Sequence, residues 1–228
     1  MKRVWITWWV TTILLGSYVM LGFLASHSSS TQIKLQPGAS AKLLLVRLLE
    51  HDLRMQLEFR GDHRNRPELG DPGQTGDSYR TGLLEYPQPG AAIRVAASSA
   101  GTEPVLFEAL PNSGWGANFV LRTLTGNLSI RPGVWRWPDP AESPRVVLHP
   151  GFNLVNVEIV SVEPPLVGEN ARVLVQPLLD FKACMPGVCW LWGSLLLWPV
   201  MLFVQVLWAV TLNAVSARKA PQNTMIFM

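Results

Sequence analysis

The sequence is poor in charge and in cysteine, and both shortages narrow the class of protein. Only 15% of the 228 residues are charged, whereas 48% are apolar, so the chain is neither disordered nor an ordinary well-solvated enzyme. Two cysteines with no histidine close by in the sequence are too few for a metal site. Ten tryptophans and a positive mean hydropathy indicate instead that part of the chain lies in lipid.

Catalytic and cofactor motifs are also absent. The sequence contains no glycine-rich phosphate loop and no nucleophile elbow. Residues 71–77 lack the complete calcium-loop pattern. The four histidines, His27, His51, His63 and His149, have no recognised ligand spacing. We therefore expect no catalytic residues, no metal and no cofactor, and a protein that is not an enzyme.

Acidic residues are absent from both ends of the chain. All 16 lie within residues 26–187 with 15 of the 19 basic residues, so this stretch has a net charge of −1. The other four basic residues, Lys2, Arg3, Arg218 and Lys219, flank the two most apolar segments. The basic pI therefore reflects membrane orientation, and we expect no nucleic-acid partner.

Two uncharged segments are long enough to cross a bilayer. Residues 4–25 number 22, which at about 1.5 Å per residue spans a hydrocarbon core about 30 Å thick. Residues 188–213 form the second and stronger candidate. With basic residues outside both, the positive-inside rule predicts a two-pass inner-membrane protein with both termini in the cytoplasm. The predicted order is a cytoplasmic N-terminus 1–3, transmembrane helix 4–25, periplasmic domain 26–187, transmembrane helix 188–213 and cytoplasmic tail 214–228.

A cleavable signal peptide is the alternative for the first segment. Its apolar stretch would usually be about 7–15 residues long, with a small residue before the cut. Here the apolar run is longer, and Phe23 lies where a small residue is expected. We favour an uncleaved anchor.

One amide, that of Gln205, falls deep within a predicted span. A polar side chain in lipid needs a protein partner, and the first span offers a close approach at Thr12 and Gly16. Either the two spans pack on each other or they contact a separate membrane subunit. We therefore treat Gln205, Thr12 and Gly16 as an intramembrane contact.

The domain between the spans has a β pattern. Leu53, Met55, Leu57 and Phe59 alternate with polar residues at period two, which indicates a half-buried strand. Other short strand candidates alternate with Pro- and Gly-rich turns, and no long amphipathic helix competes. We predict an antiparallel β-sandwich or jelly roll. Further strands are expected at 42–49, 92–97, 105–110, 119–124, 128–130, 146–149, 154–162 and 171–178.

Residues 61–90 interrupt this pattern with a long stretch rich in Gly, Pro, Asp and Arg. A 30-residue loop in a compact domain is usually either functional or mobile. Two hypotheses follow: the loop becomes ordered against a partner, or it is a flexible insertion.

Cys184 and Cys189 lie where the domain enters the second span, with Pro186 and Gly187 between them. Outside the cytoplasm such a pair can oxidise to a disulfide that closes a small loop. Free buried thiols are the alternative.

The tryptophans outside the membrane are candidates for a binding surface. Trp115 lies in a glycine-flanked loop, and Trp135 and Trp137 are two residues apart, which on an extended chain points both indoles to one face. With Arg136 they form either a sugar-stacking platform or a surface for packing and protein contact.

No family resemblance emerges from these motifs. The leading hypothesis is a non-catalytic, membrane-anchored accessory or assembly subunit that presents a periplasmic β domain to a larger integral membrane complex. The alternative is a membrane-tethered module that binds a polysaccharide or lipid-linked sugar through Trp115, Trp135 and Trp137. An enzyme at the membrane surface would need an acid or base that the sequence does not offer.

Overall fold

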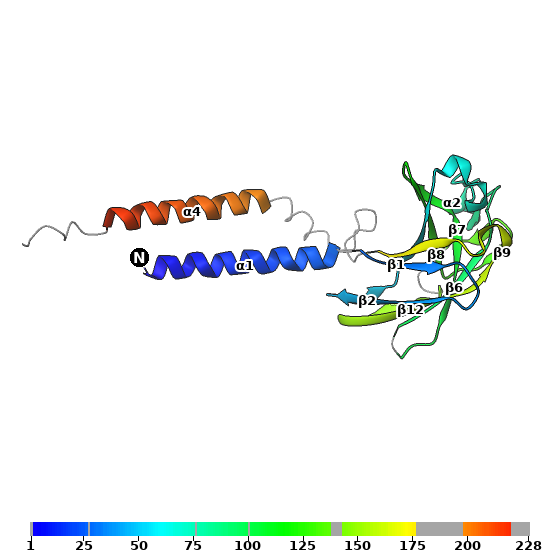
Figure 1. The fold of residues 1–228 in the computed structure, drawn as a ribbon, viewed down its shortest axis with the longest axis horizontal. Helices are drawn as coiled ribbons and strands as arrows, with labels where there is room; N and C mark the ends of the chain where they lie inside the picture. Colours follow the sequence, from blue (N-terminus) through cyan, green and yellow to red (C-terminus); the bar gives the residue numbers. More distant parts are fainter. Residues whose placement is uncertain are drawn as a thin grey trace, which may run out of the picture. The chain divides into compact units, whose positions relative to one another are not determined.

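A computed structural model describes residues 2–26, 28–75, 77–99, 101–137, 143–176 and 198–219. The chain divides into two compact units. The helical unit comprises Met1–Ser26 and Leu179–Met228, and the β unit comprises His27–Leu178. Figure 1 labels the elements of both units.

The helical unit contains two long helices, α1 (Lys2–Ser26) and α4 (Trp198–Lys219). Within α4, Pro199–Ala217 is long and apolar enough to cross a membrane. Among the described residues it is the one segment that meets both requirements, and α1 does not. The second predicted span, 188–213, overlaps this candidate helix from Pro199 onward, and residues 188–197 lie outside the described residues. Membrane insertion of residues 4–25 stays a prediction.

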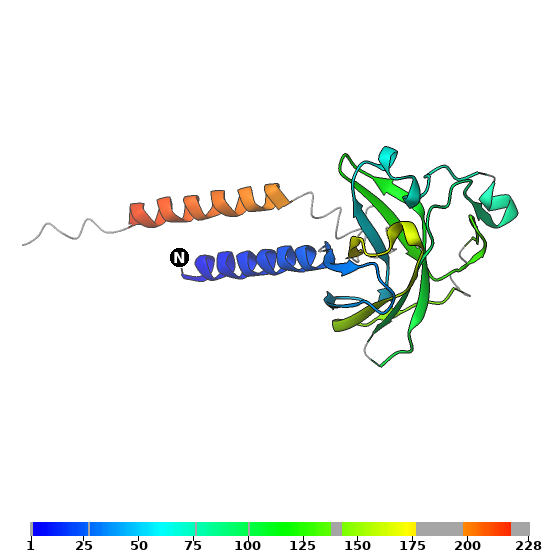
Figure 2. The ribbon, with the colours of Figure 1, turned by 45° about the vertical axis from the view of Figure 1, so that its right-hand side comes forward.

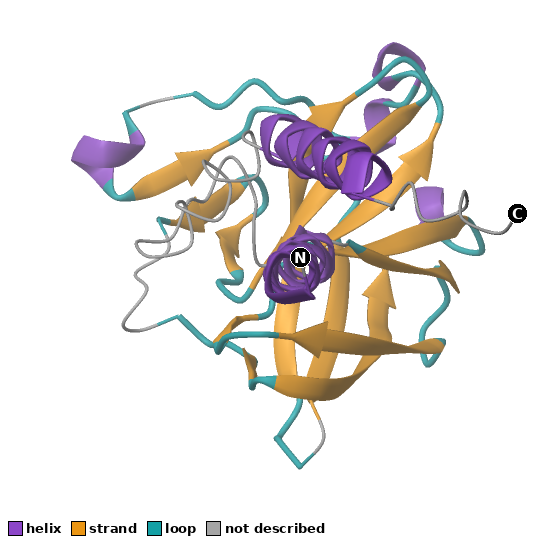
Figure 3. Cartoon of the chain, turned by 90° about the vertical axis from the view of Figure 1, so that its left-hand side faces the viewer, coloured by secondary structure: helices purple, strands orange, loops and turns teal. Residues whose placement is uncertain are grey.

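The β unit is built around one antiparallel sheet that is nearly closed. Figure 2 shows its strands curving round the unit, and Figure 3 shows them running in clearly different directions, as a twisted, curled sheet requires. This confirms the mainly-β antiparallel part of the prediction. The predicted β-sandwich or jelly roll is not shown, because eight strands form one curled sheet and not two facing ones. In sheet order the strands are β1 (Ser29–Lys34), β13 (Asn170–Val175), β4 (Met55–Arg60), β8 (Phe119–Thr125), β7 (Val105–Trp115), β6 (Ile93–Ser99), β12 (Gly151–Val162) and β2 (Ser40–Arg47).

Smaller elements complete the unit. A three-stranded sheet has the order β5 (Leu83–Glu85), β10 (Val134–Arg136), β9 (Ser129–Arg131), and a two-stranded sheet pairs β11 (Val147–Leu148) with β3 (His51–Asp52). The helical turns are η1 (His63–Asn65), η2 (Pro67–Leu69), α2 (Ser78–Thr81) and η3 (Pro164–Leu166).

Period-two alternation accounts for the strands of the large sheet. In β4, Met55, Leu57 and Phe59 are buried while the residues between them face outward, as the sequence predicts. The same alternation in β6 and β12 sends Val95, Val157 and Ile159 into one shared core. The apolar interior of the curled sheet thus follows directly from the sequence pattern.

Residues 61–90, expected to form one long loop, contain η1, η2, α2 and β5. Leu69 is fully buried in the core of the β unit itself. Arg66 pairs with Glu68 and, through two hydrogen bonds of 2.7 and 2.8 Å, with the carboxylate of Glu169 at the start of β13. The first part of the segment, around Arg66–Leu69, is thus tied to the β unit by contacts within the chain.

A buried arginine, which the sequence analysis did not single out, ties β8 to its neighbours. Arg122 lies on the inward face of β8 opposite two register shifts in β7. Its guanidinium donates to the carbonyl oxygens of Leu110 (2.7 Å), Ala109 (2.9 Å) and Ala91 (2.6 Å). Burial lowers the pKa of Arg122 to about 10, so the group is still charged at neutral pH. Arg122 therefore satisfies carbonyls at the point where the β7 ladder is irregular.

Arg122→Met should lower the free energy of unfolding by about 3 kcal/mol or more, because it leaves several buried carbonyls without donors. Denaturation of the detergent-solubilised full chain, followed by circular dichroism, measures this loss. Arg131→Met is the matched control, since the Arg131 side chain is 70% exposed and its loss should cost less than about 0.5 kcal/mol. Equal stability of the two variants would contradict the role assigned to Arg122.

Candidate functional site

An exposed apolar patch lies on the outer face of β2 and β12. Phe152 is 80% exposed, Leu44 is 63% exposed and Leu154 is 46% exposed. The strand register pairs Leu154 with Leu44 and Phe152 with Val46, so the four side chains are neighbours on one face. We call these four residues the β2–β12 patch. Adjacent large apolar side chains this open to solvent are typical of an interaction site.

The patch includes an edge strand. In the described part of the chain β2 is hydrogen-bonded in a ladder to β12 alone, and β1 forms the other edge of the sheet. Leu44 and Val46 therefore belong to the strand at the gap of the nearly closed sheet, with β1 on the other side of that gap. What the patch offers a partner is its exposed outer face.

Buried polar side chains lie behind the patch and fix its strands. Asn153, between Phe152 and Leu154, accepts from the backbone N–H of His149 (3.0 Å) and donates to its carbonyl (2.7 Å). Arg47, next to Val46, donates to the carbonyl of Gln176 (3.2 Å). The patch is thus carried by strands held in place from inside the unit.

His51 is a second buried, titratable side chain of this region beside Arg47. The residue is 7% exposed, and its Nδ1 has no hydrogen-bond partner among the described residues. Burial, and then the nearby positive charges of Arg47 and Arg54, lower the pKa of His51 to about 4. A hydrogen bond with the backbone of Leu49, and then the charge of Asp52, act in the opposite direction. His51 is therefore neutral in the folded protein at neutral pH.

The three tryptophans proposed as a platform lie in different surroundings. Trp135 is 3% exposed and packs edge-on against Tyr86, with ring centroids 5.7 Å apart. Trp137 and Arg136 are exposed, and Arg136 lines an open hollow with Leu128 and Ile130. β10 ends at Arg136, so the period-two relation does not extend to Trp137. The indoles of Trp135 and Trp137 consequently do not share an exposed face.

Trp115 lies at the end of β7 and is exposed. It lines a hollow with Asp62 and His63, whereas Trp135 lines a different hollow with Glu108 and Arg122. The three-tryptophan surface is therefore not assembled: Trp115 and Trp137 are exposed in separate places, and Trp135 is buried.

In the helical unit, Gln205 meets the first helix. Its Nε2 donates to the Thr11 hydroxyl (3.1 Å), and the Thr12 hydroxyl lies 3.3 Å from its Oε1. The indole N–H of Trp8 donates to the backbone carbonyl of Gln205 (3.1 Å). Gly16 lies apart from this contact, because a Cβ built on it would meet nothing within 4 Å. The structure thus brings Gln205 to Thr12 but not to Gly16.

Cys184 and Cys189 lie outside the described residues. Within the described ranges, no group of three or more His, Cys, Asp or Glu side chains is placed to hold a metal ion.

Comparison with known proteins does not identify a family or a function for the chain. No protein-family model matches the chain, and no curated protein matches it. Among solved structures the chain is similar to the crystal structure of a protein from Sulfurospirillum deleyianum, with 15% sequence identity and a TM-score of 0.41 over 67% of this chain and 98% of that one. None of these comparisons names a function, so function has to be inferred from the chain's own surfaces.

The depressed pKa of His51 predicts an acid-sensitive fold. The unfolded state takes up a proton near pH 6.5, whereas the folded state does so only near pH 4, so stability from this group falls as the pH drops between these values. His51→Asn should show a smaller loss of thermal stability between pH 7 and 4.5 than the unaltered chain. His149→Asn, whose imidazole is largely exposed, should keep the original loss. Parallel pH profiles for His51→Asn and the unaltered chain would contradict the prediction.

Gln205→Leu should weaken the contact between α1 and α4 by about 1 kcal/mol, since it removes the amide bonds to Thr11 and Thr12. Energy transfer between a dye on each helix, followed during SDS titration in mixed micelles, measures the contact. Thr211→Val is the control, because the Thr211 hydroxyl bonds the carbonyl of Leu207 in its own helix. A midpoint unchanged by Gln205→Leu would show that the amide does not hold the helices.

Proposed function

We propose that the protein is a non-catalytic, membrane-anchored accessory subunit whose β unit docks onto a larger integral membrane complex of the cell envelope. The observation that carries this proposal is the β2–β12 patch. A monomer in water gains nothing from an 80% exposed phenylalanine beside two exposed leucines, whereas a protein partner would remove their apolar surface from water.

The anchors in this proposal are the two apolar segments at the ends of the chain. α4 has the length and composition for one span. For α1, support comes from the hydrogen bonds between its Thr11 and Thr12 and the side-chain amide of Gln205 in α4. Lipid offers no hydrogen-bond partners, so a polar side chain in a membrane helix needs a partner in the protein. Basic residues outside both segments favour cytoplasmic termini and a periplasmic β unit.

The strand register fixes which end of the sheet carries the patch. The chain enters the sheet at Ser29 and leaves it at Val175, which are paired in register. Because neighbouring strands are antiparallel throughout, the end of β2 and the start of β12 lie at this same end of the sheet. The patch therefore lies toward the end of the β unit from which both flanking segments continue.

Leu154→Asp tests the proposal, because it places a charge in the centre of the patch. We expect at least a tenfold loss of the partner that co-purifies with the full chain in mild detergent. Val160→Asp is a closely matched control, since Val160 is on the same strand and is also 46% exposed but lies away from Leu44.

A photoreactive amino acid in place of Phe152 should cross-link to the same partner, and one in place of Val160 should not. Purification of the unaltered chain as a lone monomer, or equal recovery of the partner with Leu154→Asp and Val160→Asp, would contradict the proposal.

A further inference from the structure

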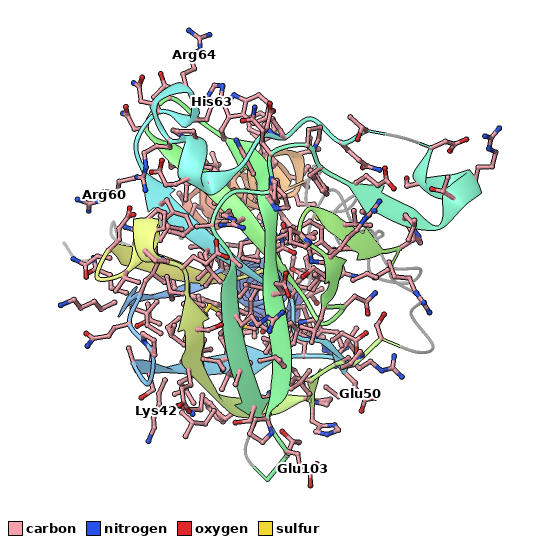
Figure 4. All side chains as sticks on the ribbon, turned by 90° about the vertical axis from the view of Figure 1, so that its right-hand side faces the viewer. Lys42, Glu50, Arg60, His63, Arg64 and Glu103 are labelled. Atoms are coloured by element: carbon pink, nitrogen blue, oxygen red, sulfur yellow. The ribbon has the colours of Figure 1, made fainter. Side chains whose placement is uncertain are left out.

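The hollow beside Trp115 is a second surface, at the opposite end of the sheet from the β2–β12 patch. It has a volume of about 490 Å³ and is lined by Asp62, His63, Arg64, Trp115, Gly116 and Ala117. These residues come from the turn after β4 and from the end of β7. The register places the ends of β4 and β7 at the opposite end of the sheet from the end of β2 and the start of β12. Figure 4 labels His63 and Arg64, in the turn after β4. A hollow of this size is within the usual range for small-ligand sites.

The aromatic wall of the hollow is held in place. Trp115 is 51% exposed and pairs in register with Val120, so its backbone is part of the β7–β8 ladder. The His63 ring lies against the indole, with centroids 4.9 Å apart and planes tilted by 36°. A Cβ at position 116 would approach the Phe119 ring to 2.4 Å, so a larger residue there would require that ring to shift. Because the Trp115 side chain is already held by its neighbours, it loses little conformational entropy when a ligand stacks on the indole.

Hydrogen-bonding groups surround this wall. Asp62 Oδ1 accepts from the backbone N–H of Arg64 (3.1 Å) and lies 3.1 Å from His63 Nδ1. Its Oδ2 and the guanidinium of Arg64 have no hydrogen-bond partner among the described residues. In Figure 4 the Arg64 side chain extends away from the ribbon. An acceptor and a forked donor are thus available beside one aromatic face.

One guanidinium in the hollow is available to a ligand. Arg64 is the one arginine and Asp62 the one acidic residue of the lining. Asp62 Oδ1 already accepts from the backbone of Arg64 and lies against His63, and Arg66 nearby is held by Glu68 and Glu169. The side chain of Arg64, which has no ion-pair partner among the described residues, is therefore the group that would pair with an anionic ligand.

We propose that this hollow binds an acidic sugar unit of a polysaccharide. In this arrangement the indole of Trp115 covers one face of the sugar ring, Arg64 pairs with the sugar carboxylate, and Asp62 accepts a hydrogen bond from a ring hydroxyl. The site lies away from the docking patch, so the two surfaces can be occupied at the same time and tested separately.

Affinity electrophoresis of the detergent-solubilised full chain through gels containing polygalacturonate, with dextran as the neutral polymer, tests the proposal. We expect polygalacturonate to retard the chain more than dextran does. Trp115→Ala should weaken the apparent affinity about tenfold or more, and Arg64→Gln about threefold, with most of the second loss in the preference for the acidic polymer.

Trp137→Ala is the control, since Trp137 is exposed but lies outside the hollow, and it should leave retardation unchanged. Trp115→Phe should retain part of the binding, and unchanged thermal unfolding of each variant separates loss of binding from loss of fold.

Equal retardation in both polymers, no retardation of the unaltered chain, or unchanged retardation of Trp115→Ala would overturn the proposal. Loss of a protein partner with Trp115→Ala but no retardation by either polymer would assign the hollow to protein contact instead. Leu154→Asp should not alter retardation, so failure of this site and failure of the docking proposal are distinguishable.

Discussion

The near-closure of one antiparallel sheet is the constraint on which the rest of the β unit depends. When eight strands close round a shared core, the strands tilt, their register is staggered and β-bulges occur. At each bulge some backbone N–H or C=O groups lose their partner in the ladder and need another hydrogen bond. At the register shifts in β7 this need is met by Arg122. The turn between β1 and β2 prolongs the β2–β12 ladder, since Gly38 donates to the carbonyl of Ile159 and Ile159 donates to that of Ala39. Closure therefore buries the inner face completely and leaves the outer face of β2 and β12 without a covering layer.

Much of the fold could be predicted from period-two alternation. Met55, Leu57 and Phe59 mark β4 because burial on one face and solvent on the other leave a direct record in the sequence. Alternation does not record which strands pair, so it could not distinguish two facing sheets from one curled sheet. It also missed β1 (SSTQIK), whose outward residues are all polar and in which one residue, Ile33, is deeply buried. Residues 61–90 look like a loop in the sequence because Leu69 reaches the core from a helical turn. Turns leave no hydrophobic periodicity that a sequence pattern could reveal.

The candidate sites were harder to predict, because the sequence pattern does not record which strands pair or where a strand ends. Trp135 and Trp137 are equivalent by spacing, yet one is buried and the other exposed because the strand ends between them. In the sequence, Arg122 cannot be distinguished from a surface arginine. Its buried role depends on the register shifts in β7, which only the structure shows. The contact of Gln205 with Thr12 could be anticipated, since an amide within an apolar helix has few possible partners. The β2–β12 patch had no sequence signal, because Leu44 and Phe152 are more than a hundred residues apart and look like ordinary core residues.

The two surfaces of the β unit differ in chemistry in a way that suits two kinds of partner. One is apolar and lies on an edge strand, toward the end of the sheet where the chain enters and leaves. The other is an aromatic hollow lined by Asp62, His63 and Arg64 at the opposite end. The most direct test of the central claim is hydroxyl-radical footprinting of Phe152 in native membranes and in the purified chain. Coverage by a partner predicts that oxidation of Phe152 is several-fold lower in native membranes, while Val160 is oxidised equally in both. Equal oxidation of Phe152 in the two preparations would contradict the account.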